Sequence, residues 1–152
     1  YWQERVEPKV LRNSNVEFIG EIDERQKADF LGNAAALLFP IDWPEPFGLV
    51  TIEAMACGTP VIAFRRGAVP EVIDDGVSGL IVDTLDGAVD AVRRIKGIDR
   101  ARVRRTFEER FTVERMCRDY VAIYGSLSDV ITKAFGSQSK RAKNAAMMTM
   151  ST

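Results

Sequence analysis

The sequence predicts an α/β fold, a Rossmann-like parallel sheet with helices on both faces. Four short runs are mainly apolar, and three of them contain no polar residue, which is typical of strands buried on both faces. Stretches with helical spacing separate successive runs, as in sheets built from βαβ units with right-handed crossovers. The four runs are Val16–Ile19, Leu37–Phe39, Val61–Phe64 and Leu80–Val82. The predicted order is therefore βαβαβαβ.

The first predicted strand and helix precede the second apolar run. Val16–Ile19 ends at Gly20, which suits a buried strand followed by a turn. From Glu24 to Ala36 the apolar residues recur at helical spacing, and Asp23 can act as the N-cap. We expect this helix to lead into the second strand.

A proline-rich loop follows the second strand. Leu37–Phe39 is stopped by Pro40, and the prolines and glycine of Ile41–Gly48 disfavour regular structure. Leu49–Cys57 has a helical pattern, which Gly58 can end in the left-handed conformation. We expect a rigid loop between this strand and this helix.

The rest of the predicted domain holds two more strands and several helices. After the third strand, Arg65–Pro70 forms a second loop before a short helical stretch. A turn over Gly76–Gly79 leads into the fourth strand. Asp86–Ile95 and Arg100–Arg110 are expected to be amphipathic helices.

A last helix is predicted after Thr112, which can cap it. Its apolar residues share one face: Val113, Met116, Tyr120, Tyr124 and Leu127. Residues 129–152 are basic and rich in Ser, Ala and Met, which predicts a disordered tail, with contact to an anionic membrane as the alternative. We therefore expect one partial domain over 1–128 and a tail over 129–152.

Composition limits the function classes. The 152 residues suit one domain, and a net charge of −1 gives no reason to expect nucleic acid as a partner. The chain has no histidine, so carboxylates must carry any proton transfer. Cys57 and Cys117 match no metal-ligand spacing and are expected to be buried and reduced.

The sequence also bears on location and completeness. No apolar run approaches the roughly 20 residues that span a bilayer, and no signal peptide is recognisable, so we expect a cytoplasmic protein. The chain starts at Tyr1 rather than Met, within a helical pattern. We expect it to be a piece of a larger protein.

The segment from Glu45 to Ala56 joins the carboxyl end of a strand to the amino terminus of a helix. Ligands of parallel sheets bind beyond this edge. Backbone amides there lack intrahelical partners and the helix dipole adds positive partial charge, so an anion such as a diphosphate is favoured. Gly48 allows the backbone to approach such a ligand closely.

Two carboxylates of this segment are the candidate functional groups. Glu53 is the single charged residue between Leu49 and Cys57, and a carboxylate there needs hydrogen-bond donors, such as two adjacent ribose hydroxyls. The alternative is that Glu53 complements the helix dipole at a solvated position. Glu45 can face the sugar end of the same ligand, or it can be an ordinary exposed acid.

Four blocks of this sequence resemble the retaining glycosyltransferases of the GT-B fold, especially the bacterial sugar transferases of family 4, or group 1. Glu45 and Glu53 match the two-glutamate signature Glu-x7-Glu of these enzymes. The blocks agree in order and spacing between about Val16 and Leu127. They are Val16–Gly20, Glu45–Leu49, Glu53–Ala63, and Val69–Ile73 followed by Gly76 and Gly79.

The resemblance implies the C-terminal, donor-binding half of a GT-B fold, without its first strands. It implies a nucleoside diphosphate sugar as partner, Glu45 as the catalytic residue at the donor sugar, and Glu53 at the ribose. The implied donor-binding residues are Gly20, Glu21, Ile22, Glu45, Pro46, Phe47, Gly48, Leu49, Val50, Thr51 and Glu53. The expected reaction is retaining transfer to a saccharide or lipid-linked acceptor, as in polysaccharide biosynthesis, without a bound metal or other cofactor.

The chain departs from the family pattern in three respects. Ala68 stands where the family commonly has a second glycine. The family's Arg and Lys that clamp the diphosphate have no match, although Arg65 and Arg66 could partly substitute or could be plain solvated charges. The N-terminal acceptor-binding domain also has no match, so we expect the fragment alone to be inactive, and any peripheral membrane contact to come through the full-length protein.

The sequence also bears on other function classes. A non-catalytic nucleotide-sugar-binding or interaction module would keep the same site, and upstream sequence would distinguish it. A receiver-type signalling domain would need clustered acids after the first strand, which Gly20–Asp23 does not provide. A nucleotide hydrolase or a dehydrogenase would need glycine motifs that the sequence lacks.

Overall fold

The computed structural model describes residues 1–128 and 130. The chain divides into two compact units, one from Tyr1 to Arg104 and one that begins at Arg105. All of the candidate site residues belong to the first unit.

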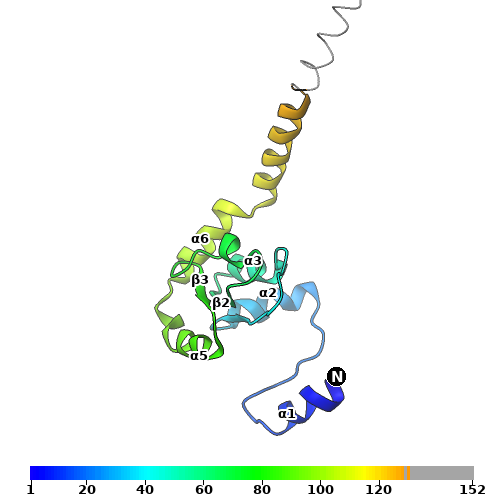
Figure 1. The fold of residues 1–152 in the computed structure, drawn as a ribbon, viewed down its shortest axis with the longest axis vertical. Helices are drawn as coiled ribbons and strands as arrows, with labels where there is room; N and C mark the ends of the chain where they lie inside the picture. The colour runs from blue at the N-terminus through cyan, green and yellow to red at the C-terminus, as the bar shows by residue number, and fades with distance from the viewer. Residues whose placement is uncertain (129, 131–152) are drawn as a thin grey trace, which may run out of the picture. The chain divides into compact units, whose positions relative to one another are not determined.

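The first unit is built on a three-stranded parallel sheet with the order β1-β2-β3 (Figure 1). The strands are β1 (Leu37–Phe39), β2 (Val61–Phe64) and β3 (Gly79–Val82). In register, Val61 lies opposite Leu37 on one side and Gly79 on the other. Because β2 is central, its first three residues are 0–2% exposed. The predicted parallel α/β sheet is confirmed.

The prediction of a strand at Val16–Ile19 is wrong, so the observed sheet has three strands rather than four. Residues 16–19 have no regular structure, and Phe18 is 62% exposed. An apolar run becomes a strand only where a neighbour supplies ladder hydrogen bonds. The described strands pair only with one another, so residues 16–19 have no partner to form a ladder with.

Helices connect and cover the strands. The first unit begins with η1 (Trp2–Val6) and α1 (Glu7–Leu11). The helices that follow are α2 (Glu24–Asn33), α3 (Leu49–Ala56), α4 (Val69–Val72), α5 (Leu85–Arg94), η2 (Ile95–Gly97) and α6 (Arg100–Arg110), the last of which crosses the boundary between the units.

Two groups of helices pack on the sheet (Figure 1). On one face, Ala91 of α5 and the adjoining Ile95 form a buried cluster with Ile62 and Leu80. α3 contacts β1 and β2, and α2 packs against α3. This arrangement leaves the carboxyl ends of the strands to the loops.

Local capping signals set the ends of the helices. Asp23 accepts hydrogen bonds from the amides of Arg25 and Gln26, and the Gln26 side chain accepts one from the Asp23 amide, which completes a capping box. α2 ends at Asn33 and not at Ala36 as expected, because Ala34 is already extended. Gly58 follows α3 with φ of 69°. Its predicted left-handed conformation is confirmed.

The second unit contains a helix over residues 113–128. The Thr112 hydroxyl accepts a hydrogen bond from the Arg115 amide at 3.3 Å, which confirms the predicted cap. The apolar residues predicted to share a face are all more than half exposed: Val113, Met116, Tyr120, Tyr124 and Leu127. The predicted tail at 129–152 lies outside the described residues except for Val130.

The cysteines differ from expectation. Cys57 is half-buried rather than fully buried. Cys117 is exposed, because it lies on the helix over residues 113–128, most of whose side chains are open to solvent. No helix in the described residues combines the length and apolar character needed to cross a bilayer.

Candidate functional site

The loops after β1 and β2 meet at Glu45. The Ala68 amide donates a hydrogen bond to the Glu45 carbonyl at 2.9 Å. Gly67 has φ of 50°, and a Cβ at this position would overlap the backbone nitrogen and carbonyl oxygen of Glu45. The loop after β2 therefore fixes the backbone of Glu45, and only glycine fits at position 67.

The Glu45 side chain is held from its own loop. The indole Nε1 of Trp43 donates a hydrogen bond to Glu45 Oε2 at 3.1 Å, and the Glu45 amide donates to the Trp43 carbonyl at 2.8 Å. Trp43 is itself 58% exposed. Neither Trp43 nor Gly67 was among the predicted site residues, because both act through contacts that spacing does not reveal.

The two arginines of the loop after β2 are paired with carboxylates. Arg66 Nε donates to Asp42 Oδ1 at 3.0 Å, which adds a further link between the two loops. Arg65 Nε lies 3.4 Å from Asp83 Oδ1. Each ion pair engages the Nε atom of its arginine and partly neutralises the charge that a diphosphate clamp would need.

Gly48 forms the entry to α3. It adopts the left-handed conformation, with φ of 76° and ψ of 67°, and is buried so closely against Phe39 that a Cβ would lie 3.0 Å from the ring. No side chain caps the first turn of α3. The Thr51 amide and hydroxyl both donate to the Gly48 carbonyl, at 2.9 and 2.7 Å. The amides of Leu49 and Val50 thus remain as the expected anion donors.

Glu53 lies in the second turn of α3 and pairs with a cation that the sequence analysis missed. Lys27 Nζ, from α2, donates to Glu53 Oε1 at 2.9 Å and to Glu24 Oε1 at 2.8 Å. These hydrogen bonds, to Glu24 first and Glu53 second, raise the pKa of Lys27. Glu53 lies beyond the first turn of α3, where the effect of the helix dipole fades. The alternative that Glu53 complements the dipole therefore loses support.

The remaining predicted residues lie in two segments, one before α2 and one before α3. Gly20, Glu21 and Ile22 form the irregular segment immediately before α2, and Gly20 has φ of 73°. Pro46 and Phe47 are exposed in the loop that leads to Gly48. Within residues 1–128 and 130, no three side chains of the metal-binding types gather into a cluster.

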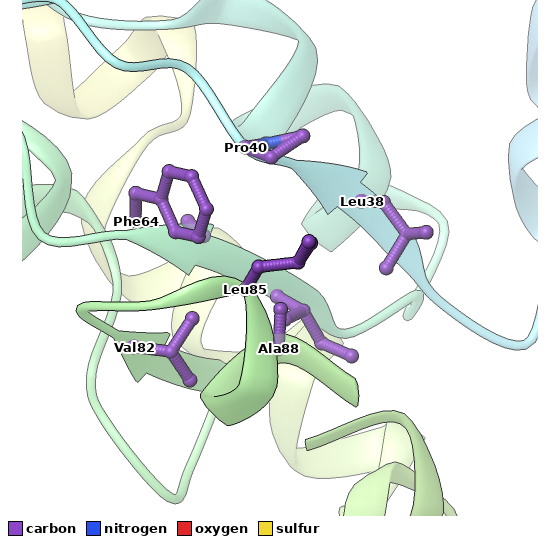
Figure 2. Close-up of a pocket in the computed structure, with 8 residues that line it drawn as sticks. Leu38, Pro40, Phe64, Val82, Leu85 and Ala88 are labelled. Carbon is purple, nitrogen blue, oxygen red and sulfur yellow. The ribbon is translucent and has the colours of Figure 1, made fainter. Parts of the chain in front are cut away.

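An apolar cavity of about 90 Å³ lies on the α5 face of the sheet (Figure 2). Figure 2 shows Leu85 and Ala88 of α5 beside Leu38 and Phe64 of the strands. Its lining residues are Leu38, Pro40, Ile62, Ala63, Phe64, Val82, Leu85 and Ala88. Because none of them has a polar side chain, the cavity offers no group for recognition of a sugar or phosphate.

Comparisons with known proteins agree on one family. Residues 8–106 match the model of the family described as glycosyl transferases group 1. A D-inositol 3-phosphate glycosyltransferase of Saccharomonospora viridis is 55% identical over 53 residues, 34% of this chain and 12% of that protein. The N-acetyl-alpha-D-glucosaminyl L-malate synthase of Bacillus anthracis is 33% identical over 128 residues, 76% of this chain and 33% of that protein.

Solved structures show the same fold. Sucrose-phosphate synthase from Thermosynechococcus elongatus superimposes with a TM-score of 0.70 and 32% identity, over 84% of this chain and 35% of that one. Anabaena HepE in complex with UDP-glucose superimposes with a TM-score of 0.68 and 20% identity, over 82% of this chain and 37% of that one. The chain thus spans little more than a third of either structure.

Proposed function

Because the chain belongs to the glycosyl transferases group 1 family, we propose that it supplies the donor-binding part of an enzyme that uses a nucleoside diphosphate sugar. The reaction would transfer the sugar, with retention of configuration, to a saccharide or lipid-linked acceptor. Structural support comes from one arrangement: Glu45 on a clamped loop, Glu53 on α3, and the uncapped amino terminus of α3 between them.

In this proposal each part of the arrangement meets one part of the donor. The Glu53 carboxylate accepts hydrogen bonds from the ribose hydroxyls, since an ionised carboxylate is an acceptor with about four lone-pair sites. The amides of Leu49 and Val50 face the diphosphate at the positive end of the helix dipole. Glu45, eight residues before Glu53, reaches the donor sugar.

The arrangement also suggests how the site would promote the reaction. As the bond to the sugar breaks, negative charge grows on the leaving diphosphate and positive charge on the sugar ring. The amino terminus of α3 would stabilise the first, and the Glu45 carboxylate, oriented by Trp43, would stabilise the second. In this proposal the retaining transfer needs no bound metal.

Other parts of the reaction are assigned to residues beyond this chain. Arg65 and Arg66 are engaged by Asp83 and Asp42, so we propose that the cations that hold the diphosphate, and the acceptor-binding domain, come from elsewhere in a longer protein. On this basis the fragment alone is inactive. We further propose a cytoplasmic enzyme, with any peripheral membrane contact made through the full-length protein.

Calorimetric titration tests the donor site. The intact protein would be titrated with UDP, GDP and ADP and with their sugar conjugates. We expect Glu53→Ala to weaken every nucleotide about ten- to a hundredfold, since hydrogen bonds to a charged group contribute about 1.5–3 kcal/mol. Glu45→Ala should weaken only the sugar conjugates.

A matched control is Asp90→Asn, which changes an exposed carboxylate of α5 that pairs with Arg93. It should leave every affinity unchanged. Nucleotide binding that persists undiminished in Glu53→Ala would contradict the donor-site assignment. Donor binding without transfer to any acceptor by the intact protein would favour the alternative, a non-catalytic nucleotide-sugar-binding module.

A further inference from the structure

Lys27 connects α2 to the candidate ribose carboxylate. Its ammonium group lies between two carboxylates, 2.9 Å from Glu53 Oε1 and 2.8 Å from Glu24 Oε1. The side chains differ in exposure: 25% for Lys27, 37% for Glu53 and 88% for Glu24. The contact with Glu53 is therefore the more sheltered of the two and the less weakened by solvent.

The contact divides the Glu53 carboxylate into an anchored and an open oxygen. Oε1 accepts from Lys27, whereas no group among residues 1–128 and 130 donates to Oε2. Glu53 is also the only charged residue of α3, so no neighbour on its own helix can orient it. Without Lys27, a glutamate that is 37% exposed would keep its rotamer freedom until a ligand arrived.

The helix that carries Lys27 is itself fixed at both ends. The capping box of Asp23 and Gln26 holds its amino terminus. At its carboxyl end the Arg100 guanidinium donates to the carbonyls of Gly32 and Ala34, both at 2.7 Å. Because α2 is held at both ends, the Lys27 ammonium group is a preorganised donor. It therefore sets the orientation of the Glu53 side chain, and Glu53 does not set the position of Lys27.

Building on the proposed function, we propose that Lys27 is a positioning residue for ribose recognition. It holds Oε1 of Glu53 so that Oε2 and the second lone pair of Oε1 face the two adjacent ribose hydroxyls. Lys27 touches the carboxylate and not the nucleotide in this arrangement. It should therefore determine how strongly the protein prefers ribonucleotides over 2′-deoxyribonucleotides.

The test measures this preference in the intact protein. Calorimetry would compare UDP with 2′-deoxy-UDP, or the same pair for GDP or ADP if one of those binds instead. In Lys27→Met we expect the ribonucleotide to bind about tenfold more weakly and the affinity for the deoxynucleotide to change little. The ratio of the two affinities should then fall toward one. Lys27→Arg, which keeps a cationic donor, should restore most of the preference.

One control variant and one replacement variant complete the experiment. Glu24→Gln removes the other carboxylate that holds Lys27 and should leave the preference intact. Lys27→Gln keeps the polarity of the side chain without its charge, and would replace Lys27→Met if that variant failed to fold.

The outcomes separate this role from the proposed function. An unchanged preference in the Lys27 variants, with nucleotide still bound, would overturn the role of Lys27 alone. Equal weakening of ribo- and deoxynucleotides would also overturn it, because Lys27 would then act on the phosphates or on the fold. A wild-type protein that binds none of the nucleotides would overturn the proposed function itself.

Discussion

Gly67 lies where the loop after β2 touches the backbone of Glu45, and the contact leaves no space for a side chain. The neighbouring residues add one link each: Ala68 through its amide to Glu45, and Arg66 through its guanidinium to Asp42. Three consecutive residues therefore hold the loop that carries the candidate catalytic carboxylate. Ala68 stands where the family commonly has glycine. Its contact with Glu45 is made by a backbone amide, so alanine can make this contact as well as glycine.

Substitution of Gly67 by alanine should displace Glu45. The new Cβ would overlap Glu45 backbone atoms, and φ of 50° is unfavourable for alanine by about 1–2 kcal/mol. We expect Gly67→Ala to lower the affinity for a nucleotide sugar more than for the free nucleotide, as measured by calorimetry. Gly97→Ala, where a Cβ meets nothing within 4 Å, is the matched control. Equal affinities in Gly67→Ala and wild type would show that the contact does not position Glu45.

At the scale of elements, a buried polar junction joins α2, α3 and α6. Thr59, just after α3, is fully buried, donates to the Leu31 carbonyl at 2.6 Å and accepts from Arg100 at 2.9 Å. Arg100 also reaches the last carbonyls of α2. These carbonyls have no intrahelical partner, so the guanidinium takes the place of a glycine cap.

Removal of this guanidinium should destabilise the first unit. Arg100→Met keeps much of the apolar stem and leaves three partly buried acceptors without this donor, at a cost of about 1–3 kcal/mol. Urea denaturation would measure the loss. Arg93→Met, which breaks an exposed ion pair with Asp90, should cost at most about 1 kcal/mol. Similar effects of the two substitutions would mean that the junction contributes no more than a surface pair.

At the scale of the whole molecule, apolar side chains remain exposed on the α5 face of the sheet. Leu38 of β1 is 58% exposed and Leu85 of α5 is 71% exposed, and both line the cavity of Figure 2. Val89 and Val92 extend this apolar surface along α5 at 48% exposure. Among the described strands, β1 also pairs on one edge only. A free strand edge beside apolar surface favours association.

The chain of 152 residues on its own is therefore expected to self-associate. Leu85→Glu should reduce this association, because it adds charge to the surface and an acid at the start of α5, where the helix dipole tolerates it. Light scattering over a range of concentrations would measure the mean mass. Leu11→Glu changes a leucine of α1 that is 80% exposed and should have little effect. A monomeric wild-type chain at all concentrations would refute the expectation.

The sequence by itself determined the features that depend on neighbours along the chain. Uniformly apolar runs predicted β1, β2 and β3, because a strand buried on both faces has no polar side to mark. Asp23, Gly58 and Thr112 were identified as helix-end residues because caps and left-handed turns act within a few residues. Glu45 and Glu53 stood out by their spacing, and their roles at the donor remain a prediction.

Only the tertiary structure decided which distant residues meet. It left Val16–Ile19 outside the sheet, because a strand needs a partner that its own composition cannot supply. It brought Lys27 to Glu53 across 26 positions and Arg100 to Gly32 across 68. Such contacts depend on how helices pack, and no local pattern encodes them. The sequence thus marked the carboxylates, and the packing of α2 and the loop after β2 decided what holds them.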